Sequence, residues 1–276
     1  MPAADPLADP EAARAALIEA VAEAGDIALR FFRADPRSWT KGAAKSPVTE
    51  ADVAIDVFLR QRLIARAPAY GWLSEETQDS AERLTRRRLW IVDPIDGTRA
   101  YMAGGTDWTI SAALVEDGRA IAAALFAPVS REMFSASLGR GATRNGVPIS
   151  AGERTDPAGA RMAGPKQGYP AVTTILENAG QVERIRSLAL RIARVAEGTL
   201  DAAFAGAGGN DWDLAAADLL MHEAGGRLTT HAGADLVFNR PKPVHGALVA
   251  AGAALHPPLL ARLASFAPPP LAERSL

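Results

Sequence analysis

Cysteine does not occur among the 276 residues, and its absence removes several kinds of chemistry at once. Disulfide bonds, thiolate zinc sites and cysteine nucleophiles all need a thiol, so this chain can form none of them. A chain without cysteine fits a reducing compartment, and we expect a cytoplasmic protein. The first ten residues also lack the basic and apolar regions of a secretory signal.

A large excess of charge and a long apolar run are missing as well. Lys and Arg number 30 against 32 Asp and Glu, for a formal net charge of −2. This balance provides no global basic field, so we expect neither a nucleic-acid polymer nor an anionic membrane as a partner. The apolar stretches are short and interrupted by charges, which argues against a membrane span. An anionic substrate must therefore be held by local features such as metal ions, helix N-termini or a few Arg and Lys.

The spacing of apolar residues predicts an N-terminal α+β half, residues 1–155. Apolar residues recur at helical spacing over 11–33, and acidic residues open a second helix over 49–67. The apolar run over 88–92 has the profile of a buried strand. Three further strands over 109–136 predict an antiparallel meander.

A segment rich in Gly, Pro and Asp, which runs from Ile149 to about Pro170, marks the predicted internal boundary. We take the second half to be residues 156–276. Helices and short strands alternate in this half, which indicates an α/β arrangement with a mixed sheet. The fold class expected for the whole chain is therefore α/β.

The segment Asp93-Pro94-Ile95-Asp96-Gly97-Thr98, which we call the aspartate motif, follows the strand predicted over 88–92. Asp93 and Asp96 can point two carboxylates into a cleft. Pro94 cannot extend a strand ladder, so we expect the chain to leave the sheet there. The free Ile95 carbonyl then becomes a further oxygen ligand, and such hard oxygen ligands suit Mg²⁺. The same pattern also fits an ordinary Asp-Pro turn followed by a helix cap.

Two further acidic segments favour the metal site. Ser74-Glu75-Glu76-Thr77 follows a short apolar stretch, and Asn210-Asp211-Trp212-Asp213 opens a predicted helix. Taken alone, the glutamates fit a solvated turn and Asp213 fits a helix cap.

Together these segments resemble the inositol monophosphatase superfamily of lithium-sensitive sugar and nucleotide phosphatases. The resemblance extends from about Lys41 to Gly226, with its segments in the order of that superfamily. It is carried by Ser46-Pro47-Val48-Thr49-Glu50-Ala51-Asp52, Ser74-Glu75-Glu76-Thr77, Trp90-Ile91-Val92 with the aspartate motif, and Trp212-Asp213-Leu214-Ala215-Ala216 with Glu223-Ala224-Gly225-Gly226. It implies a layered α-β-α-β-α sandwich with a metal site between the two halves. It also implies lithium inhibition and two or three Mg²⁺ ions per site.

The resemblance implies a role for each matching residue. Glu75, Asp93 and the Ile95 carbonyl would hold the first Mg²⁺, and Asp93, Asp96 and Asp213 the second. Glu75, with water, would help to place a third ion.

For the reacting groups, the resemblance implies that Gly97 and Thr98 bind the phosphate together with the metal-bridging Asp96. Thr98 and Asp52 would orient the attacking water. Phosphoryl transfer to water then needs no covalent enzyme intermediate.

The substrate is expected to be a small phosphate ester, and two positions indicate which one. Inositol-type members of the superfamily carry a Glu where this chain has Gly206, and loss of a group that reads hydroxyls weakens selectivity for inositol. The 3'(2'),5'-bisphosphate nucleotidases carry a Lys where this chain has Arg191, which could bind a second phosphate. Lys166 could add charge. In those nucleotidases a Ser-rich stretch precedes the Lys, whereas this chain has Leu188-Ala189-Leu190.

The sequence therefore predicts a Mg²⁺-dependent 3'(2'),5'-bisphosphate nucleotidase acting on adenosine 3',5'-bisphosphate. Inositol-1-monophosphatase is the main alternative, followed by a histidinol-phosphate or fructose-bisphosphate phosphatase. A non-catalytic regulator that binds metal or phosphate is the alternative from another class. We expect a monomer or homodimer.

Overall fold

A seven-stranded sheet forms the larger half of the protein. The computed structural model describes residues 5, 7–34, 37–41, 46–165, 170–180 and 182–266. The spatial order of the sheet is β3-β4-β5-β6-β7-β8-β9, and only the β3–β4 pair is parallel. The predicted meander is confirmed, because β5, β6 and β7 are consecutive antiparallel neighbours. The strands are β3 (Gly71–Ser74), β4 (Arg88–Asp96), β5 (Thr109–Glu116), β6 (Arg119–Ala127), β7 (Glu132–Ser137), β8 (Ala142–Arg144) and β9 (Val147–Ile149).

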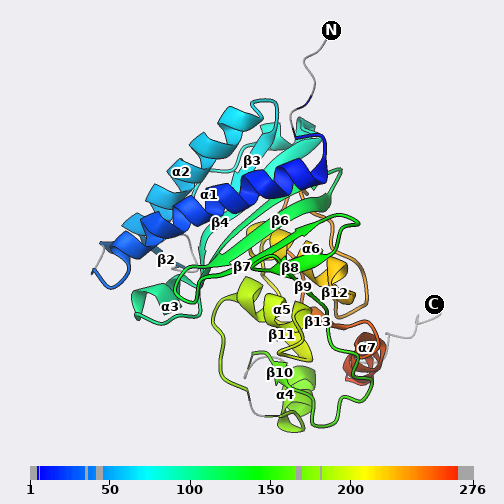
Figure 1. Ribbon diagram of the computed structural model, residues 1–276. Coiled ribbons are helices and arrows are strands. Elements are labelled where there is room, and N and C mark those ends of the chain that lie inside the picture. The colour runs from blue at the N-terminus through cyan, green and yellow to red at the C-terminus, as the bar shows by residue number, and fades with distance from the viewer. Residues whose placement is uncertain are drawn as a thin grey trace, which may run out of the picture.

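Two long helices, α1 (Pro10–Phe31) and α2 (Glu50–Arg66), cover one face of this sheet (Figure 1). Asp9 caps α1 and Pro10 occupies its first turn, where a missing N–H costs nothing. The buried stripe of α1 is mostly alanine, which lets the helix approach the sheet closely. Both predicted helices are confirmed, each with ends within three residues of the expected ones.

The C-terminal half adds a four-stranded sheet and places α5 (Leu188–Ala196) and α6 (Asp211–Glu223) between the two sheets (Figure 1). Alanines at 215–217 of α6 are all buried, as a helix enclosed on both sides requires. The outer face carries α4 (Pro170–Glu177) and α7 (His256–Ser265), so the predicted α-β-α-β-α layering is confirmed. The sheet order is β10 (Met162–Ala163), β11 (Ala202–Ala205), β13 (Leu248–Gly252) and β12 (Gly226–Thr230). The division after residue 155 stays a prediction.

The predicted exit of the chain from the sheet at Pro94 is wrong. β4 pairs with β5 through Asp93 opposite Ser111 and resumes at Asp96 opposite Thr109. Three steps along β4 therefore match two along β5, which is a β-bulge. Pro94, which has no N–H to donate, lies inside this irregular stretch. The strand continues to Asp96.

Three short elements complete the surroundings of the site. α3 (Thr98–Met102) begins at the last residue of the aspartate motif, and a 3₁₀ helix spans Ala81–Thr85. β1 (Ser38–Lys41) and β2 (Ser46–Thr49) form an antiparallel hairpin.

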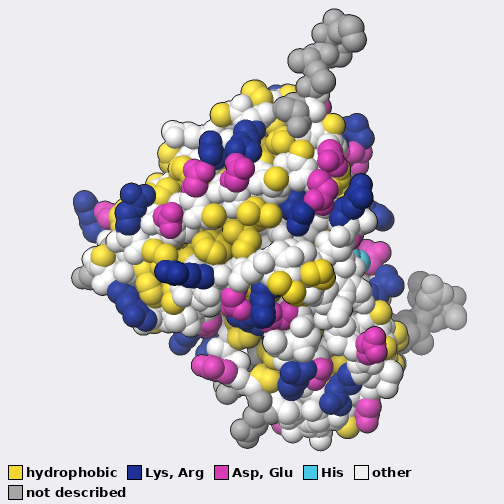
Figure 2. Space-filling model, in the orientation of Figure 1, with side chains coloured by type: hydrophobic (Ala, Val, Ile, Leu, Met, Phe, Trp, Pro, Cys, Tyr) yellow, Lys and Arg dark blue, Asp and Glu magenta, His cyan; other side chains and the backbone are white. Residues whose placement is uncertain are grey.

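The distribution of surface charge and the character of the helices agree with the near-neutral net charge and the short apolar stretches of the sequence. On the face drawn in Figure 2, Lys and Arg are interspersed with Asp and Glu, so neither sign forms an extended patch there. None of the described helices is both long and apolar enough to cross a membrane.

Candidate active site

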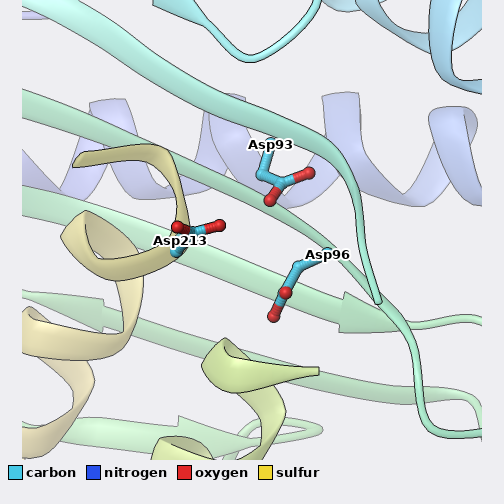
Figure 3. Close-up of side chains that lie close together, drawn as sticks. All are labelled: Asp93, Asp96 and Asp213. Carbon is cyan, nitrogen blue, oxygen red and sulfur yellow. The ribbon is translucent and has the colours of Figure 1, made fainter. Parts of the chain in front are cut away.

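Three aspartates converge where β4 meets the start of α6 (Figure 3). Asp93, Asp96 and Asp213 each offer a carboxylate oxygen within 4.8 Å of the others. In a regular strand, residues three apart point to opposite faces, because side chains alternate. The bulge in β4 adds one residue between Asp93 and Asp96, which turns both carboxylates to the same side.

Hydrogen bonds from the chain orient each of the three aspartates. Asp93 Oδ1 accepts the Ile95 N–H at 3.0 Å, whereas its Oδ2 is buried and unpartnered. Asp96 Oδ2 accepts Ser187 Oγ–H at 2.5 Å and a backbone N–H of α5 at 2.7 Å. Asp213 Oδ2 accepts the Asn210 N–H at 2.7 Å. The chain thus orients three carboxylates and brings an oxygen of each within 4.8 Å of the other two.

Burial and mutual repulsion raise the carboxyl pKa values of the cluster. Burial, followed by the charge of Asp96, raises the pKa of Asp213 to about 7. Burial and then Glu75 raise the pKa of Asp93 well above its usual value. Burial also raises the pKa of Asp96, against the hydrogen bonds from Ser187 and α5. Unpartnered, buried carboxylate oxygens fit a bound cation, and an all-oxygen set fits Mg²⁺.

Glu75 follows β3 and lines the same cavity as the three aspartates. Burial raises its carboxyl pKa, which nearby Lys41 opposes. Lys41 Nζ lies 3.2 Å from Glu75 Oε1 and 2.5 Å from Glu76 Oε1, and it donates to the Glu75 carbonyl at 3.0 Å. Sequence reasoning gave Lys41 no role, because only the hairpin of β1 and β2 carries it to the glutamates.

Asp52 and Thr98, predicted as a pair, lie beside each other. Asp52 Oδ2 accepts the Thr49 N–H at 2.8 Å and the Thr49 hydroxyl at 2.6 Å, which forms a capping box at the start of α2. Its Oδ1 is 3.5 Å from Thr98 Oγ1, which donates to the Ile95 carbonyl at 3.0 Å. Burial raises the pKa of Asp52 to about 7, although the Thr49 bonds oppose this.

Gly97 is required by its backbone conformation. Its φ is +96°, where a side chain is strained, and a Cβ would lie 3.1 Å from the Asp107 carbonyl. From this conformation the chain turns directly into α3, and the Gly97 carbonyl accepts two N–H groups of that helix.

A cavity of about 520 Å³ joins these groups to a set of arginines that sequence reasoning largely missed. Four acids and four arginines line it, together with the aspartate motif's Ile95, Gly97 and Thr98 and with Pro47. The acids are Glu75, Asp93, Asp96 and Asp213, and the arginines are Arg99, Arg184, Arg186 and Arg191.

Of the predicted substrate cations, Arg191 lines this cavity and Lys166 falls outside the described residues. The two terminal nitrogens of Arg191 donate to the Phe204 carbonyl at 3.0 Å and to the Ile185 carbonyl at 2.9 Å. Its charge faces the cavity from a fixed position, and Asp96 is close enough to favour it.

The model of the inositol monophosphatase family matches residues 9–266, nearly the whole chain. The chain belongs to the inositol monophosphatase family. An inositol-1-monophosphatase of Caulobacter vibrioides is 30% identical, over 90% of this chain and 99% of the relative. A histidinol-phosphatase of Mycobacterium tuberculosis is 32% identical, over 85% of this chain and 91% of the relative. The crystal structure of the extragenic suppressor protein suhB from Bartonella henselae has the same fold, with a TM-score of 0.82 at 24% identity, and covers 93% of this chain and 100% of that one.

Membership makes the chain a phosphatase, which agrees with the sequence prediction at that level. The inositol-1-monophosphatase and the histidinol-phosphatase are named for different phosphate esters, so the substrate has to be argued from the cavity.

Proposed function

We propose that this member of the family is a Mg²⁺-dependent phosphatase of small bisphosphates, which removes the 3'-phosphate of adenosine 3',5'-bisphosphate. The observation that carries the proposal is the cavity itself, where a cluster of carboxylates for metal ions shares one space with four arginines. A substrate with one phosphate at the metals and a second anionic group would complement both sets of charge.

The carboxylate cluster supports the metal assignment. Glu75, Asp93 and the Ile95 carbonyl would hold one ion, and Asp93, Asp96 and Asp213 another, with Glu75 helping to place a third. Bound Mg²⁺ would neutralise charge on the phosphate and make the attacking water easier to deprotonate. The chain's own contribution is to orient the carboxylates through Ser187 and the backbone, so that little rearrangement is needed on binding.

The pair of Asp52 and Thr98 supports a role in placing the attacking water. A water that donates to Asp52 Oδ1 and contacts Thr98 Oγ1 would be fixed by two groups anchored to different helices. Because its pKa is about 7, Asp52 can accept a proton near neutral pH. Gly97 and Thr98, with Asp96, would contact the phosphate oxygens.

The arginines favour a bisphosphate over the other esters considered. Histidinol phosphate carries a cationic amine, which four arginines would repel. Inositol phosphate offers neutral hydroxyl groups, and the position expected to read them is Gly206, which has no side chain. Arg191 adds positive charge next to Asp96, where a phosphate would bind.

Phosphate release with Mg²⁺ tests the proposal, with adenosine 3',5'-bisphosphate and inositol-1-phosphate compared at equal concentration and an EDTA blank. We expect preference for the nucleotide, no release in EDTA, and loss of activity in Asp213→Asn. The exposed Asp235→Asn serves as the matched control and should retain activity. Preference for inositol phosphate would refute the substrate assignment and keep the metal chemistry. Phosphate binding without hydrolysis of any ester would instead support a non-catalytic regulator.

A further inference from the structure

The four arginines of the cavity differ in the hydrogen bonds and ion pairs that their side chains form with the rest of the chain. Arg191 donates to two backbone carbonyls. Arg186 is tied to Asp107, whose Oδ2 accepts the Arg186 N–H at 2.6 Å and whose Oδ1 lies 3.3 Å from Arg186 Nη1. The side chains of Arg99 and Arg184 are exposed and form no hydrogen bond or ion pair within the described ranges. Two cations are therefore available to a ligand.

Arg99 and Arg184 lie at different parts of the cavity. Arg99 lies in α3, directly after Thr98, and so belongs to the end of the cavity where the reacting phosphate would bind. Arg184 precedes α5 and lines a second cavity of about 430 Å³ as well. Since both cavities include Arg184 and Arg186, this segment forms the boundary between them. A ligand extending from the carboxylates toward the second cavity would pass Arg184.

The surroundings of Arg184 favour an anionic group. Burial lowers the pKa of Arg191, the charge of Asp96 opposes this, and the nearby charge of Arg184 lowers it further. Two acids line the second cavity: Asp107 is already engaged by Arg186 through two bonds, and the exposed Glu183 directly precedes Arg184. A phosphate or carboxylate beside Arg184 would relieve the repulsion and could accept a bidentate pair of N–H groups.

We propose that Arg184 is the specificity-determining residue that binds the remote anionic group of the substrate, where the two cavities meet. This inference rests on the proposed function, because it assumes that the reacting phosphate occupies the carboxylate end. Arg191 then supplies fixed background charge, and Arg99 acts on the reacting phosphate.

The test compares adenosine 3',5'-bisphosphate with adenosine 3'-monophosphate, which keeps the reacting ester and lacks the remote phosphate. For Arg184→Gln we expect KM for the bisphosphate to rise roughly 10- to 100-fold, the loss of a charge-assisted hydrogen bond, with the monophosphate unchanged. Arg99→Gln should impair both substrates by a similar factor. Arg262→Gln, an exposed position in α7, removes the same charge far from both cavities and should change neither.

The outcomes separate this inference from the proposed function. If the wild-type protein prefers the bisphosphate and Arg184→Gln keeps that preference, the role of Arg184 is refuted while the function stands. An equal loss for both substrates in Arg184→Gln would also refute it, because it would show a general effect on the site. If the wild-type protein shows no preference for the bisphosphate, the proposed substrate fails, and the inference fails with it.

Discussion

Replacing Asp93 by asparagine should make the metal-free protein more stable at alkaline pH while removing its activity. Asp93 is fully buried among acidic groups, and its Oδ2 has no hydrogen-bond partner among the described residues. The asparagine side chain would keep the oxygen that accepts the Ile95 N–H and would offer an amide nitrogen to the neighbouring carboxylates. The substitution thus removes repulsion without creating a cavity.

The size of the effect follows from the raised carboxyl pKa values. Asp213 gives the scale for a buried aspartate of this cluster, since its pKa of about 7, against 3.8 for an ordinary aspartate, corresponds to about 4 kcal/mol once the group is ionised. Burial raises the pKa of Asp93 well above its usual value too. Because the folded-state pKa is the higher one, the ionisation cost is absent below about pH 4, grows between about pH 4 and 7, and is fully present above that range.

We therefore expect the free energy of unfolding of Asp93→Asn to be near that of wild type at pH 4. At pH 8 it should be about 2 to 4 kcal/mol higher, after allowance for imperfect replacement of the native contacts. Urea denaturation in EDTA at the two pH values measures this difference. Saturating Mg²⁺ should reverse the order, since a ligand at 100 times its Kd stabilises by about 2.7 kcal/mol and the variant would bind it poorly.

Asp201→Asn is the matched control, because Asp201 is a buried aspartate with a cationic partner. Burial raises its pKa, but the ion pair with Arg161 outweighs burial and leaves the pKa below its usual value. Its stabilising contribution is present above about pH 4 and is lost in acid, so this variant should be less stable than wild type at pH 8. If Asp93→Asn is destabilised at pH 8 as Asp201→Asn is, the argument from like charges is refuted.

Three further substitutions have defined expectations. Ser187→Ala removes both the cap of α5 and the hydroxyl bound to Asp96. Urea denaturation should show a free energy of unfolding lower by about 1 to 3 kcal/mol, and calorimetry a weaker Mg²⁺ affinity. Unchanged affinity would exclude the orienting role. His245→Ala leaves the buried Asp211 carboxylate without the ring nitrogen at 2.7 Å, so unfolding should cost about 2 to 4 kcal/mol less, with partial recovery in His245→Gln. Equal stability of the two variants would argue against that hydrogen bond. Gly97→Ala places a residue with a Cβ at a φ of +96°. The free energy of unfolding should fall by about 1 to 3 kcal/mol, and inhibition by inorganic phosphate should weaken. Inhibition at wild-type strength would show that phosphate binds elsewhere.

The sequence alone determined the two long N-terminal helices, the meander and the identity of the acidic residues. The buried stripe of α1 and the apolar runs of β5 and β6 depend on neighbours a few residues apart, which a local pattern records. In the turn between β5 and β6, Asp117 and Gly118 both have positive φ, as a tight hairpin turn requires. The aspartate motif and its companion segments were specific enough to indicate the family, which the match over residues 9–266 shows.

Only the tertiary structure decided how these groups meet. The bulge that puts Asp93 and Asp96 on one side arises from the pairing of β4 with β5, and local sequence predicted an exit from the sheet instead. Ser187 contacts Asp96 from 91 residues away, and Lys41 contacts Glu75 from 34 residues away. The arginines before α5 had no motif to mark them. Contacts between distant segments depend on how sheets and helices pack in three dimensions, and no periodicity along the chain records that packing.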